Sequence, residues 1–481
     1  MTQADAPLAA ALEQYNQQTK AVFTIPGHHR GAGASAWWAD HKACGTFQFD
    51  VTETPRTDDL HAPEGAICQA QLLAAEACGA DQAFFLVNGT TCGIEALLLA
   101  TAGPGQTVLL PRNAHKSALM GLILTGAEPV YVMPELSEAG CVGGISPAAM
   151  KQQLARCTLP AAALLIHPTY DGFCSDLKEL TALCHAWDIP VLTDEAHGAH
   201  FHFCSQLPQD ALSCGVDGTV QSFHKTNGSL TQSAMLLLRG SRIDPVRVRQ
   251  ALHLVQSTSP SYLLMLSLDL ARREMALHGQ TLWAQTIQRA DWLRSQIQAI
   301  PGLICWAPED WRGRAAVVAA DPTRLRIDAT ALGLTGFQLQ QIACERFGID
   351  FELADHQAVL AILSYAVSET ELDQLLKMLR QVSAERLGAP VVKARQALPP
   401  VPPMELLPRE AFFRPGEVVR WEKAKGRISA ETVIPYPPGI PVLCPGERIT
   451  AEAWTYLEQC RRQRMHLQGV RDASLETICV F

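Results

Sequence analysis

Between about residues 80 and 240, short apolar runs alternate with stretches of helical periodicity, and this alternation constrains the fold more than any other feature of the 481-residue chain. It is typical of a parallel sheet whose strands are joined by crossover helices. In residues 175–187, Leu177, Leu180 and Cys184 recur at helical spacing, as a helix that covers such a sheet requires. We therefore expect an α/β fold. The expected strands are residues 83–87, 108–110, 130–133, 162–166, 191–193 and 219–223.

The chain is too long for one ordinary core, so we expect several domains. Strand-like residues 315–319 and a helical run after Gly336 indicate a smaller α+β domain, and the proline-rich residues 398–403 predict a stiff linker. The expected division is an N-terminal arm (1–60), a large domain (61–302), a small α+β domain (303–390), a linker (391–410) and a C-terminal unit (411–481).

Composition argues against several classes of protein. The net charge is −9 and no cluster of Lys and Arg is present, so we expect no nucleic-acid partner. No apolar run approaches the roughly 18 residues of a membrane span, and no secretory signal precedes the first helix, so we expect no membrane partner. Fifteen cysteines without a C-x-x-C pair suggest reduced thiols in a cytoplasmic protein.

Ligands of an open parallel sheet bind beyond the carboxyl ends of the strands, so the residues that follow each strand are informative. Gly89, Thr90 and Thr91 follow the first expected strand and open a helical run. Backbone N–H groups, hydroxyls and the helix dipole at such a position favour a phosphate. A simple helix cap with a tight turn also explains these residues.

Asp194 follows the apolar strand at 191–193. A carboxylate at this position could keep the ring nitrogen of a pyridine cofactor protonated, which makes the ring an electron sink. A metal site formed by His197, His200 and His202 is an alternative. In an extended segment, however, His197 and His200 would point to opposite faces, so we expect no metal, and ordinary loop histidines remain a further alternative.

Lys225 follows the last expected strand, flanked by Ser222 and His224. A lysine near a cationic or apolar site loses its proton readily and becomes a nucleophile toward a carbonyl, although a lysine at the rim of a sheet is as often a solvated cation. The order of phosphate loop, Asp194 and Lys225 at successive strand ends is more specific than any one element. It predicts pyridoxal phosphate (PLP), held as a Schiff base.

Two further segments follow expected strands. His115 comes after the strand at 108–110 and could stack on a planar cofactor ring, or be an ordinary polar loop residue. Residues 168–172 follow the strand at 162–166 and could shape the pocket, although a simple turn explains them equally well.

Together, these segments resemble the bacterial ornithine/lysine/arginine decarboxylases of the fold-type-I PLP superfamily, and the compact length resembles the short form of that family. The likeness extends to residues 348–355 and 436–441, and so covers nearly the whole chain. The matching segments of the N-terminal half are residues 26–31, 58–61, 88–91, 112–117, 194–198 and 222–226.

The resemblance implies an aspartate-aminotransferase-like large domain with a mostly parallel sheet, a smaller α+β domain and a C-terminal unit. It further implies that Lys225 carries the Schiff base, that Asp194 pairs with the ring nitrogen and that His115 stacks on the ring. The remaining residues implied in cofactor binding are Gly89, Thr90, Thr91, His197, Ser222 and His224.

The implied reaction is decarboxylation of a basic L-amino acid, arginine, lysine or ornithine, to the corresponding di- or polyamine and CO2. Because a buried cation without a partner is costly, the far end of the substrate needs a carboxylate. The candidates are Glu352, Glu431 and Asp171. The superfamily usually places its active site at a dimer interface, so we expect a homodimer or higher homo-oligomer. Residues that could reach in from a partner chain are Glu53, Asp58 and Asp59.

Some residues depart from the family pattern: Cys92 and Gly93 after the phosphate loop, His29 in place of a usual lysine, and Asn227 after Lys225. PLP binding is still expected, but the choice of substrate stays open. Two alternatives therefore remain. One is another fold-type-I activity such as an aminotransferase, and the other is a catalytically dead regulatory relative.

Overall fold

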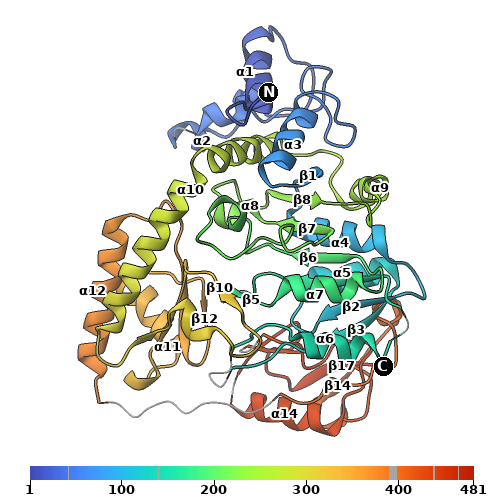
Figure 1. Cartoon of the computed structure of the whole chain (residues 1–481), viewed down its shortest axis with the longest axis vertical. Coiled ribbons are helices and arrows are strands. Elements are labelled where there is room, and N and C mark those ends of the chain that lie inside the picture. The colour runs from blue at the N-terminus through green and yellow to red at the C-terminus, as the bar shows by residue number, and fades with distance from the viewer. Residues whose placement is uncertain (42, 138–140, 158, 389–397, 437–438, 464) are drawn as a thin grey trace. The chain divides into compact units, whose positions relative to one another are not determined.

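The computed structural model describes every residue except 42, 138–140, 158, 389–397, 437–438 and 464 (Figure 1). The first part of the expected linker and the middle of the 436–441 segment therefore lie outside the described residues. The described chain divides into two compact units. Unit 1 comprises Met1–Thr101, Ala162–His167 and Cys184–Trp283, and unit 2 comprises Ala102–Ala161, Pro168–Leu183 and Ala284–Phe481.

Five strands of unit 1 follow one another in the order β1-β8-β7-β6-β4, and Figure 1 shows the first four of them stacked in that order. β4, β6 and β7 are parallel, whereas β8 is antiparallel to both β7 and β1. The three parallel strands therefore end at the same edge. The strands are β1 (Gln82–Leu86), β4 (Ala162–Ile166), β6 (Val191–Asp194), β7 (Gly218–Gln221) and β8 (Ala234–Leu238).

Helices surround these strands. The helix that follows β1 packs closely on the sheet because it carries a glycine: a Cβ on Gly93 would lie 2.7 Å from side-chain atoms of both Leu86 and Val220. The helices of unit 1 are α1 (Pro7–Gln18), α2 (Ala36–Asp40), α3 (Ala66–Ala77), α4 (Gly89–Thr101), α8 (Phe223–Thr226) and α9 (Pro245–Val255). Two helices have residues in both units, α7 (Leu177–His185) and α10 (Tyr262–Gln298).

β1 is an edge strand, and two buried glutamines cap its free side. The Oε1 atom of Gln71 accepts the N–H of Phe85 at 2.8 Å, and that of Gln256 accepts the N–H of Val87 at 2.9 Å. Buried backbone donors need partners, and here side-chain amides supply what a neighbouring strand would otherwise provide. Gln256 thereby also fixes the residue that leads into the turn at Asn88 and Gly89.

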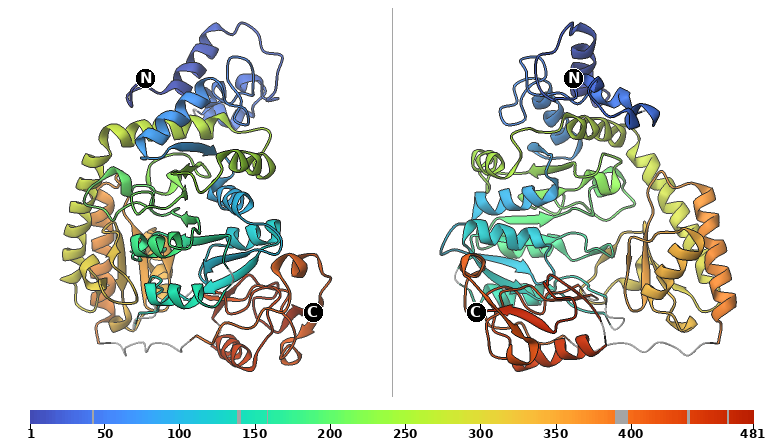
Figure 2. Two further views of the ribbon diagram at one scale, coloured as in Figure 1. Left: turned by 45° about the vertical axis from the view of Figure 1, so that its right-hand side comes forward. Right: turned by 180° about the vertical axis from the view of Figure 1, so that it is seen from behind.

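Unit 2 contains a parallel pair, β2 and β3, and a four-stranded antiparallel sheet in the order β12-β13-β11-β9. The antiparallel sheet and α12 (Glu369–Arg386) share a core that includes Leu325, Val359, Leu376 and Leu379. Figure 2 shows the orange helix beside the strands of this sheet. The strands of these elements are β2 (Thr107–Pro111), β3 (Glu128–Val132), β9 (Ile304–Cys305), β11 (Arg324–Asp328), β12 (Leu353–Ala354) and β13 (Ala358–Ile362).

The C-terminal part of unit 2, residues 398–481, has its own core around Trp421, Leu443 and Leu457. Its elements are α13 (Pro408–Phe413), β14 (Glu417–Arg420), β15 (Ile434–Tyr436), α14 (Ala451–Arg462), β16 (His466–Gln468) and β17 (Thr477–Val480). The remaining elements of unit 2 are α5 (Lys116–Thr125), α6 (Pro147–Leu154), β5 (Phe173–Cys174), β10 (Ala319–Ala320) and α11 (Gly336–Ile342).

Two expectations about local structure were wrong, and one strand was missed. The strand expected at 219–223 ends at Gln221, because the helical turn of α8 begins at Phe223. Of the strand expected at 315–319 only Ala319 is extended, since Ala315 and Ala316 have φ angles of 49° and 56°. β8 was not expected, because an antiparallel strand breaks the strand–helix alternation. α13 begins at Pro408, within the last residues of the segment expected as a linker.

No helix in the described part of the chain is long and apolar enough to cross a membrane. The five-part division expected from the sequence stays a prediction.

Candidate active site

The turn between β1 and α4 has the features of a phosphate site. Gly89 has a φ of 72°, a left-handed conformation that glycine adopts without strain. Thr90 follows at the start of α4, and its Oγ1 lies 3.2 Å from Oγ of Ser222, which comes directly after β7. Two hydroxyls and the first N–H groups of a 13-residue helix therefore gather at the ends of two strands. This donor set suits a phosphate monoester.

A glutamine that the sequence did not single out also holds this turn. Gln232 donates its Nε2 to the carbonyl of Val87 at 2.5 Å, from a backbone φ of 86° that is rare for a side-chain-bearing residue. Its partner lies 145 residues away in the chain. No local pattern could have indicated this contact.

Lys225 lies in the short helix α8 after β7, and its side chain is exposed within the chain. Its Nζ is 3.1 Å from Nε2 of His197, a residue only 8% exposed. An ammonium group has no lone pair to offer, so Lys225 donates and His197 accepts at Nε2. The lysine expected from the sequence is thus paired with a histidine of the Asp194 segment.

His224 is anchored from the same helix. Its Nδ1 donates to the carbonyl of Ser233 at 2.8 Å. Burial lowers the pKa of His224, and the neighbouring Lys225 charge lowers it further. The imidazole next to the lysine is therefore neutral at neutral pH.

Asp194 is the last residue of β6 and is half-buried, and its Oδ1 accepts the N–H of Ala196 at 3.1 Å. The next residue, Glu195, is fully buried and holds the strand ends together. Its carboxyl group accepts from Ala211 N at 2.8 Å, Gln221 Nε2 at 2.8 Å and Thr219 Oγ1 at 3.1 Å. Burial, reinforced by Asp210, raises the pKa of Glu195 to about 8.

The histidines after Asp194 do not form an extended segment, contrary to expectation. Residues 196–200 form turns, followed by the 3-10 helix Phe201–Phe203. The ring of His200 packs against Trp283 at a centroid distance of 4.5 Å, while Nδ1 of His202 lies 3.2 Å from Asp210. Among the residues that the structure describes, no cluster of three or more His, Cys, Asp or Glu side chains could hold a metal ion.

Three departures from the family pattern have structural explanations. Cys92 is buried and donates its thiol to the carbonyl of Gly89 at 3.1 Å, within the turn. Gly93 allows α4 to approach the sheet. Asn227 is fully buried and donates its Nδ2 to the carbonyl of Ala199 at 2.8 Å. This bond ties the segment after Lys225 to the segment after Asp194. His29 lies in a 3-10 helix near the N-terminus, and nothing in the structure explains its departure.

His115 belongs to unit 2, where it caps the N-terminus of α5 after β2. Its Nδ1 is 2.9 Å from Ser117 Oγ and accepts the Ser117 N–H at 3.3 Å. The cap orients the imidazole at the beginning of the helix.

The three carboxylates expected to bind the substrate differ in their surroundings. Glu352 is exposed and accepts a hydrogen bond from the phenol of Tyr170. Asp171 is paired with Arg326 at 3.0 Å, and burial raises its pKa. Glu431 is buried, and its two oxygens accept the N–H groups of Arg471 and Cys479, both at 3.0 Å. Glu352 is therefore the most accessible of the three.

The acidic residues near the N-terminus also have local partners. Asp58 accepts the N–H groups of Gly65 and Ile67 at 2.9 and 2.8 Å, at the start of α3. Asp59 accepts the N–H of His61 at 2.8 Å, and Glu53 accepts the hydroxyl of Thr52 at 2.5 Å. Within one chain these carboxylates shape the turns that precede α3.

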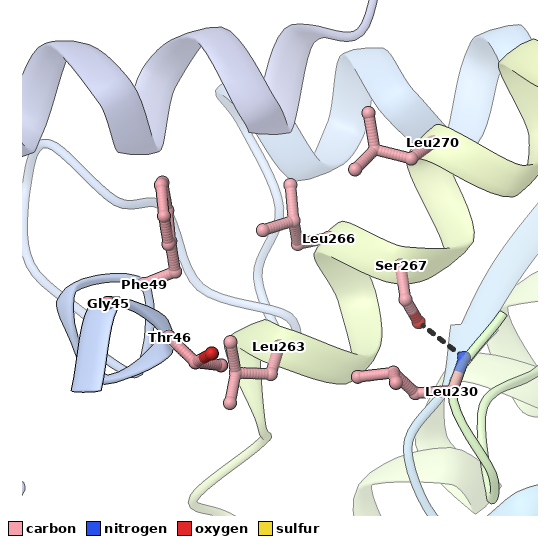
Figure 3. A pocket seen from close by; sticks show the side chains of 8 residues that line it. All are labelled: Gly45, Thr46, Phe49, Leu230, Leu263, Leu266, Ser267 and Leu270. Carbon is pink, nitrogen blue, oxygen red and sulfur yellow. Dashed lines mark hydrogen bonds between the residues drawn. The ribbon is translucent and has the colours of Figure 1, made fainter. Parts of the chain in front are cut away.

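A separate hollow in unit 1, of about 410 Å³, offers no acid–base chemistry (Figure 3). Its lining is apolar or small, and the polar contact drawn there is the hydrogen bond from Leu230 N to Ser267 Oγ at 3.1 Å. The lining residues are Gly45, Thr46, Phe49, Leu230, Leu263, Leu266, Ser267 and Leu270.

Comparison with known proteins gives a consistent family. The Orn/Lys/Arg decarboxylase major domain matches residues 6–371, and the C-terminal domain of the same family matches residues 393–473. An arginine decarboxylase of Bacillus subtilis (strain 168) is 38% identical over 485 residues, which cover 100% of this chain and 99% of the relative. An arginine decarboxylase of Bacillus anthracis is 36% identical over 484 residues, covering 100% and 98%. The structure of the Escherichia coli constitutive lysine decarboxylase matches with a TM-score of 0.85 at 21% identity, covering 99% of this chain and 82% of that one, and shows the shared fold.

Proposed function

Because the chain belongs to the Orn/Lys/Arg decarboxylase family and decarboxylates a basic L-amino acid with PLP as its cofactor, we propose that its substrate is arginine. The observation that supports arginine most directly is the full-length likeness to arginine decarboxylases at 36–38% identity. The accessible carboxylate of Glu352 beside Tyr170 adds to it, because a planar guanidinium binds a carboxylate through two parallel hydrogen bonds.

We propose that Lys225 holds PLP through its Nζ, with His197 orienting that amine. Their 3.1 Å contact supports these roles. When bound, PLP supplies an electron-withdrawing ring that takes up the electron pair left as the α-carboxylate departs as CO2. Asp194 would keep the ring nitrogen protonated, and His115 would stack on the ring and hold it flat.

The phosphate of PLP would be bound by Thr90, Thr91, Ser222 and His224, with Gly89 leaving room for the turn. The hydroxyl pair at 3.2 Å supports this assignment, since two donors are already gathered there. His224 is neutral because burial lowers its pKa, so it would contribute a hydrogen bond rather than a charge. The chain's part in the reaction is thus orientation of the departing carboxylate and exclusion of competing proton removal.

The cofactor assignment is tested by reduction with borohydride. The purified protein should absorb in the visible, lose that band on reduction, and then carry the coenzyme on the peptide that contains Lys225. Lys225→Ala should bind no reducible coenzyme. Retention of a reducible band in Lys225→Ala would show that another residue holds PLP.

The substrate assignment is tested by CO2 release from arginine, lysine and ornithine. Arginine should have the highest kcat/KM. Glu352→Gln should lower kcat/KM for arginine about 30- to 100-fold, because a guanidinium loses its charged partner. Glu345→Gln is the matched control, since Glu345 is also exposed in unit 2 and accepts from Gln341. Keto acid formed without CO2 would instead indicate an aminotransferase.

We also propose that the enzyme works in the cytoplasm as a homodimer, in polyamine biosynthesis. Cys78 and Cys92 are buried thiols, and such side chains pack as small apolar residues in a reducing compartment. Trp37 and Trp38 are 55% and 42% exposed and their ring centroids lie 5.1 Å apart. Adjacent exposed aromatic side chains of this kind favour a protein–protein contact. Light scattering of the holoenzyme should give twice the chain mass of 52.3 kDa, and a monomer would overturn the dimer.

A further inference from the structure

The C-terminal part of unit 2 holds the segment that ends in His115 through a buried ion pair. Arg112 and Glu447 are 2% and 0% exposed. Nη1 and Nη2 of Arg112 donate to the two oxygens of Glu447 at 2.5 and 2.7 Å, and Nε donates to the carbonyl of Pro441 at 2.9 Å. Glu447 also accepts the N–H of Cys444 at 2.7 Å. Such a bidentate pair fixes direction as well as distance.

A second arginine holds the other end of the same helix. Nη1 of Arg409, in α13, donates to the carbonyls of Ile123 and Leu124 at 3.1 and 2.8 Å. These carbonyls belong to the last turn of α5 and have no partner of their own within the helix. A cation at the C-terminus of a helix is also favoured by the helix dipole. Two independent contacts from the C-terminal part therefore bracket α5 and its cap.

A short, braced link joins Arg112 to His115. The N–H of Arg112 donates to the carbonyl of Val132 at 3.0 Å, and the N–H of Ala114 donates to that of Pro111 at 3.1 Å. His115 itself is locked as the cap of α5 by Ser117. Because the N–H groups of Arg112 and Ala114 are both hydrogen-bonded and His115 caps α5, we expect a shift of the Arg112 guanidinium to move the imidazole.

We infer that the C-terminal part of this chain positions His115 on the cofactor, through Arg112 with Glu447 at one end of α5 and Arg409 at the other. We call these three residues the C-terminal clamp. They are positioning residues, since they touch neither cofactor nor substrate in the proposed arrangement. The inference rests on the proposed stacking role of His115.

The first test replaces one partner without changing its shape. In Glu447→Gln, the PLP dissociation constant should rise about tenfold, the loss typical when a supporting shell is disturbed. It is measured by fluorescence titration of the cofactor-free protein. The visible circular dichroism of bound PLP should fall, because a mobile His115 no longer fixes the ring. KM for arginine should change less than kcat.

Two further variants guard against a merely structural effect. Arg409→Ala removes an exposed side chain, so it should fold normally and yet shift both PLP signals in the same direction as Glu447→Gln. Glu458→Gln is the matched control, because it breaks the contact of Glu458 with Arg461 inside α14, at 2.9 Å, without touching α5. It should leave both signals unchanged.

A double-mutant cycle decides whether the clamp acts through His115. The effect of Glu447→Gln on the PLP dissociation constant should largely vanish in a His115→Ala background. Equal effects in both backgrounds, or unchanged PLP signals in Glu447→Gln and Arg409→Ala, would overturn the inference. Failure of the proposed function looks different: the unaltered protein would release no CO2 from any of the three amino acids.

Discussion

The residues at the strand ends of unit 1, around Lys225 and Asp194, and the C-terminal clamp of unit 2 differ in the charge of the side chains that hold them in place. Around Lys225, Asp194 and the turn at Gly89 the supports are neutral: the amides of Asn227 and Gln232, and His224, whose pKa burial lowers. In the clamp the support is a buried ion pair, Arg112 with Glu447.

This difference follows from the pKa values that each region has to preserve. A buried charge beside Lys225 or Asp194 would shift the pKa of the groups that must bind the cofactor, whereas a neutral amide fixes position without that effect. Glu195 fits the pattern, since burial raises its pKa to about 8 and keeps it largely protonated at neutral pH. In the clamp no neighbouring group has to change its charge, so the stronger geometric restraint of an ion pair can be used.

The largest effect is expected where a charge is removed from the clamp. Glu447→Ala leaves Arg112 buried without its partner and should lower the free energy of unfolding by about 3–5 kcal/mol. Glu405→Ala breaks the exposed pair with Arg448 in the same part of the chain, and should cost less than about 1 kcal/mol. Urea denaturation of both variants measures the difference. Equal losses of unfolding free energy in the two variants would mean that burial does not make the Arg112–Glu447 pair more important than an exposed pair.

The converse change adds a charge to the neutral region. Asn227→Asp replaces a buried donor with a carboxylate that faces the carbonyl of Ala199, and should cost about 3 kcal/mol. Asn227→Ala loses only the hydrogen bond and should cost about 1 kcal/mol. If the two variants unfold at the same urea concentration, a buried charge at position 227 is no more destabilising than the loss of the hydrogen bond, and the hypothesis is wrong.

The pH dependence of stability tests Glu195. Folding raises its pKa from 4.5 to about 8, so its contribution to stability is complete below about pH 4.5 and is lost as the pH rises toward 8. Glu195→Gln removes this titration. Relative to the unaltered protein, the variant should gain on the order of 1.4 kcal/mol per pH unit across that window. Parallel stability curves from about pH 5 to 8 would show that Glu195 does not titrate there.

A smaller effect is expected from packing alone in the same region. Gly93→Ala places a methyl group 2.7 Å from Leu86 and Val220, which should cost about 1–2 kcal/mol without any dependence on pH. Thermal denaturation at two pH values checks both parts of this expectation. A pH-dependent loss would couple the packing of α4 to the titration of Glu195.

Much of the fold was predictable because its signal is local. The strand expected at 162–166 is β4, since a strand buried on both faces is a continuous apolar run. The fold class, the decarboxylase family and PLP as the cofactor are confirmed. The end of β7 was missed because an apolar residue such as Phe223 suits a buried strand and a buried helix equally well. Phe223 begins a helix because the chain turns at Ser222.

The supports of the site could not be predicted, because their partners are distant in sequence. Val87 is held by Gln232 and Gln256, which lie 145 and 169 residues away, and Arg112 meets Glu447 across 335 residues. Glutamine and arginine carry no periodic signal that would reveal such contacts. The roles of Lys225, Asp194 and His115 stay predictions, and the experiments above address them.

The capped edge of β1 bears on how the protein behaves outside the folded state. An open strand edge is a template on which another chain can pair and begin an aggregate. Gln71 and Gln256 close that template, but Gln256 comes from the segment after α9, far along the chain from β1. A ribosome-bound chain released as far as β8 can pair β1 with β8 but still lacks Gln256, so we expect the edge at Val87 to stay open. Chaperone dependence during synthesis should thus concentrate in the interval before Gln256 emerges.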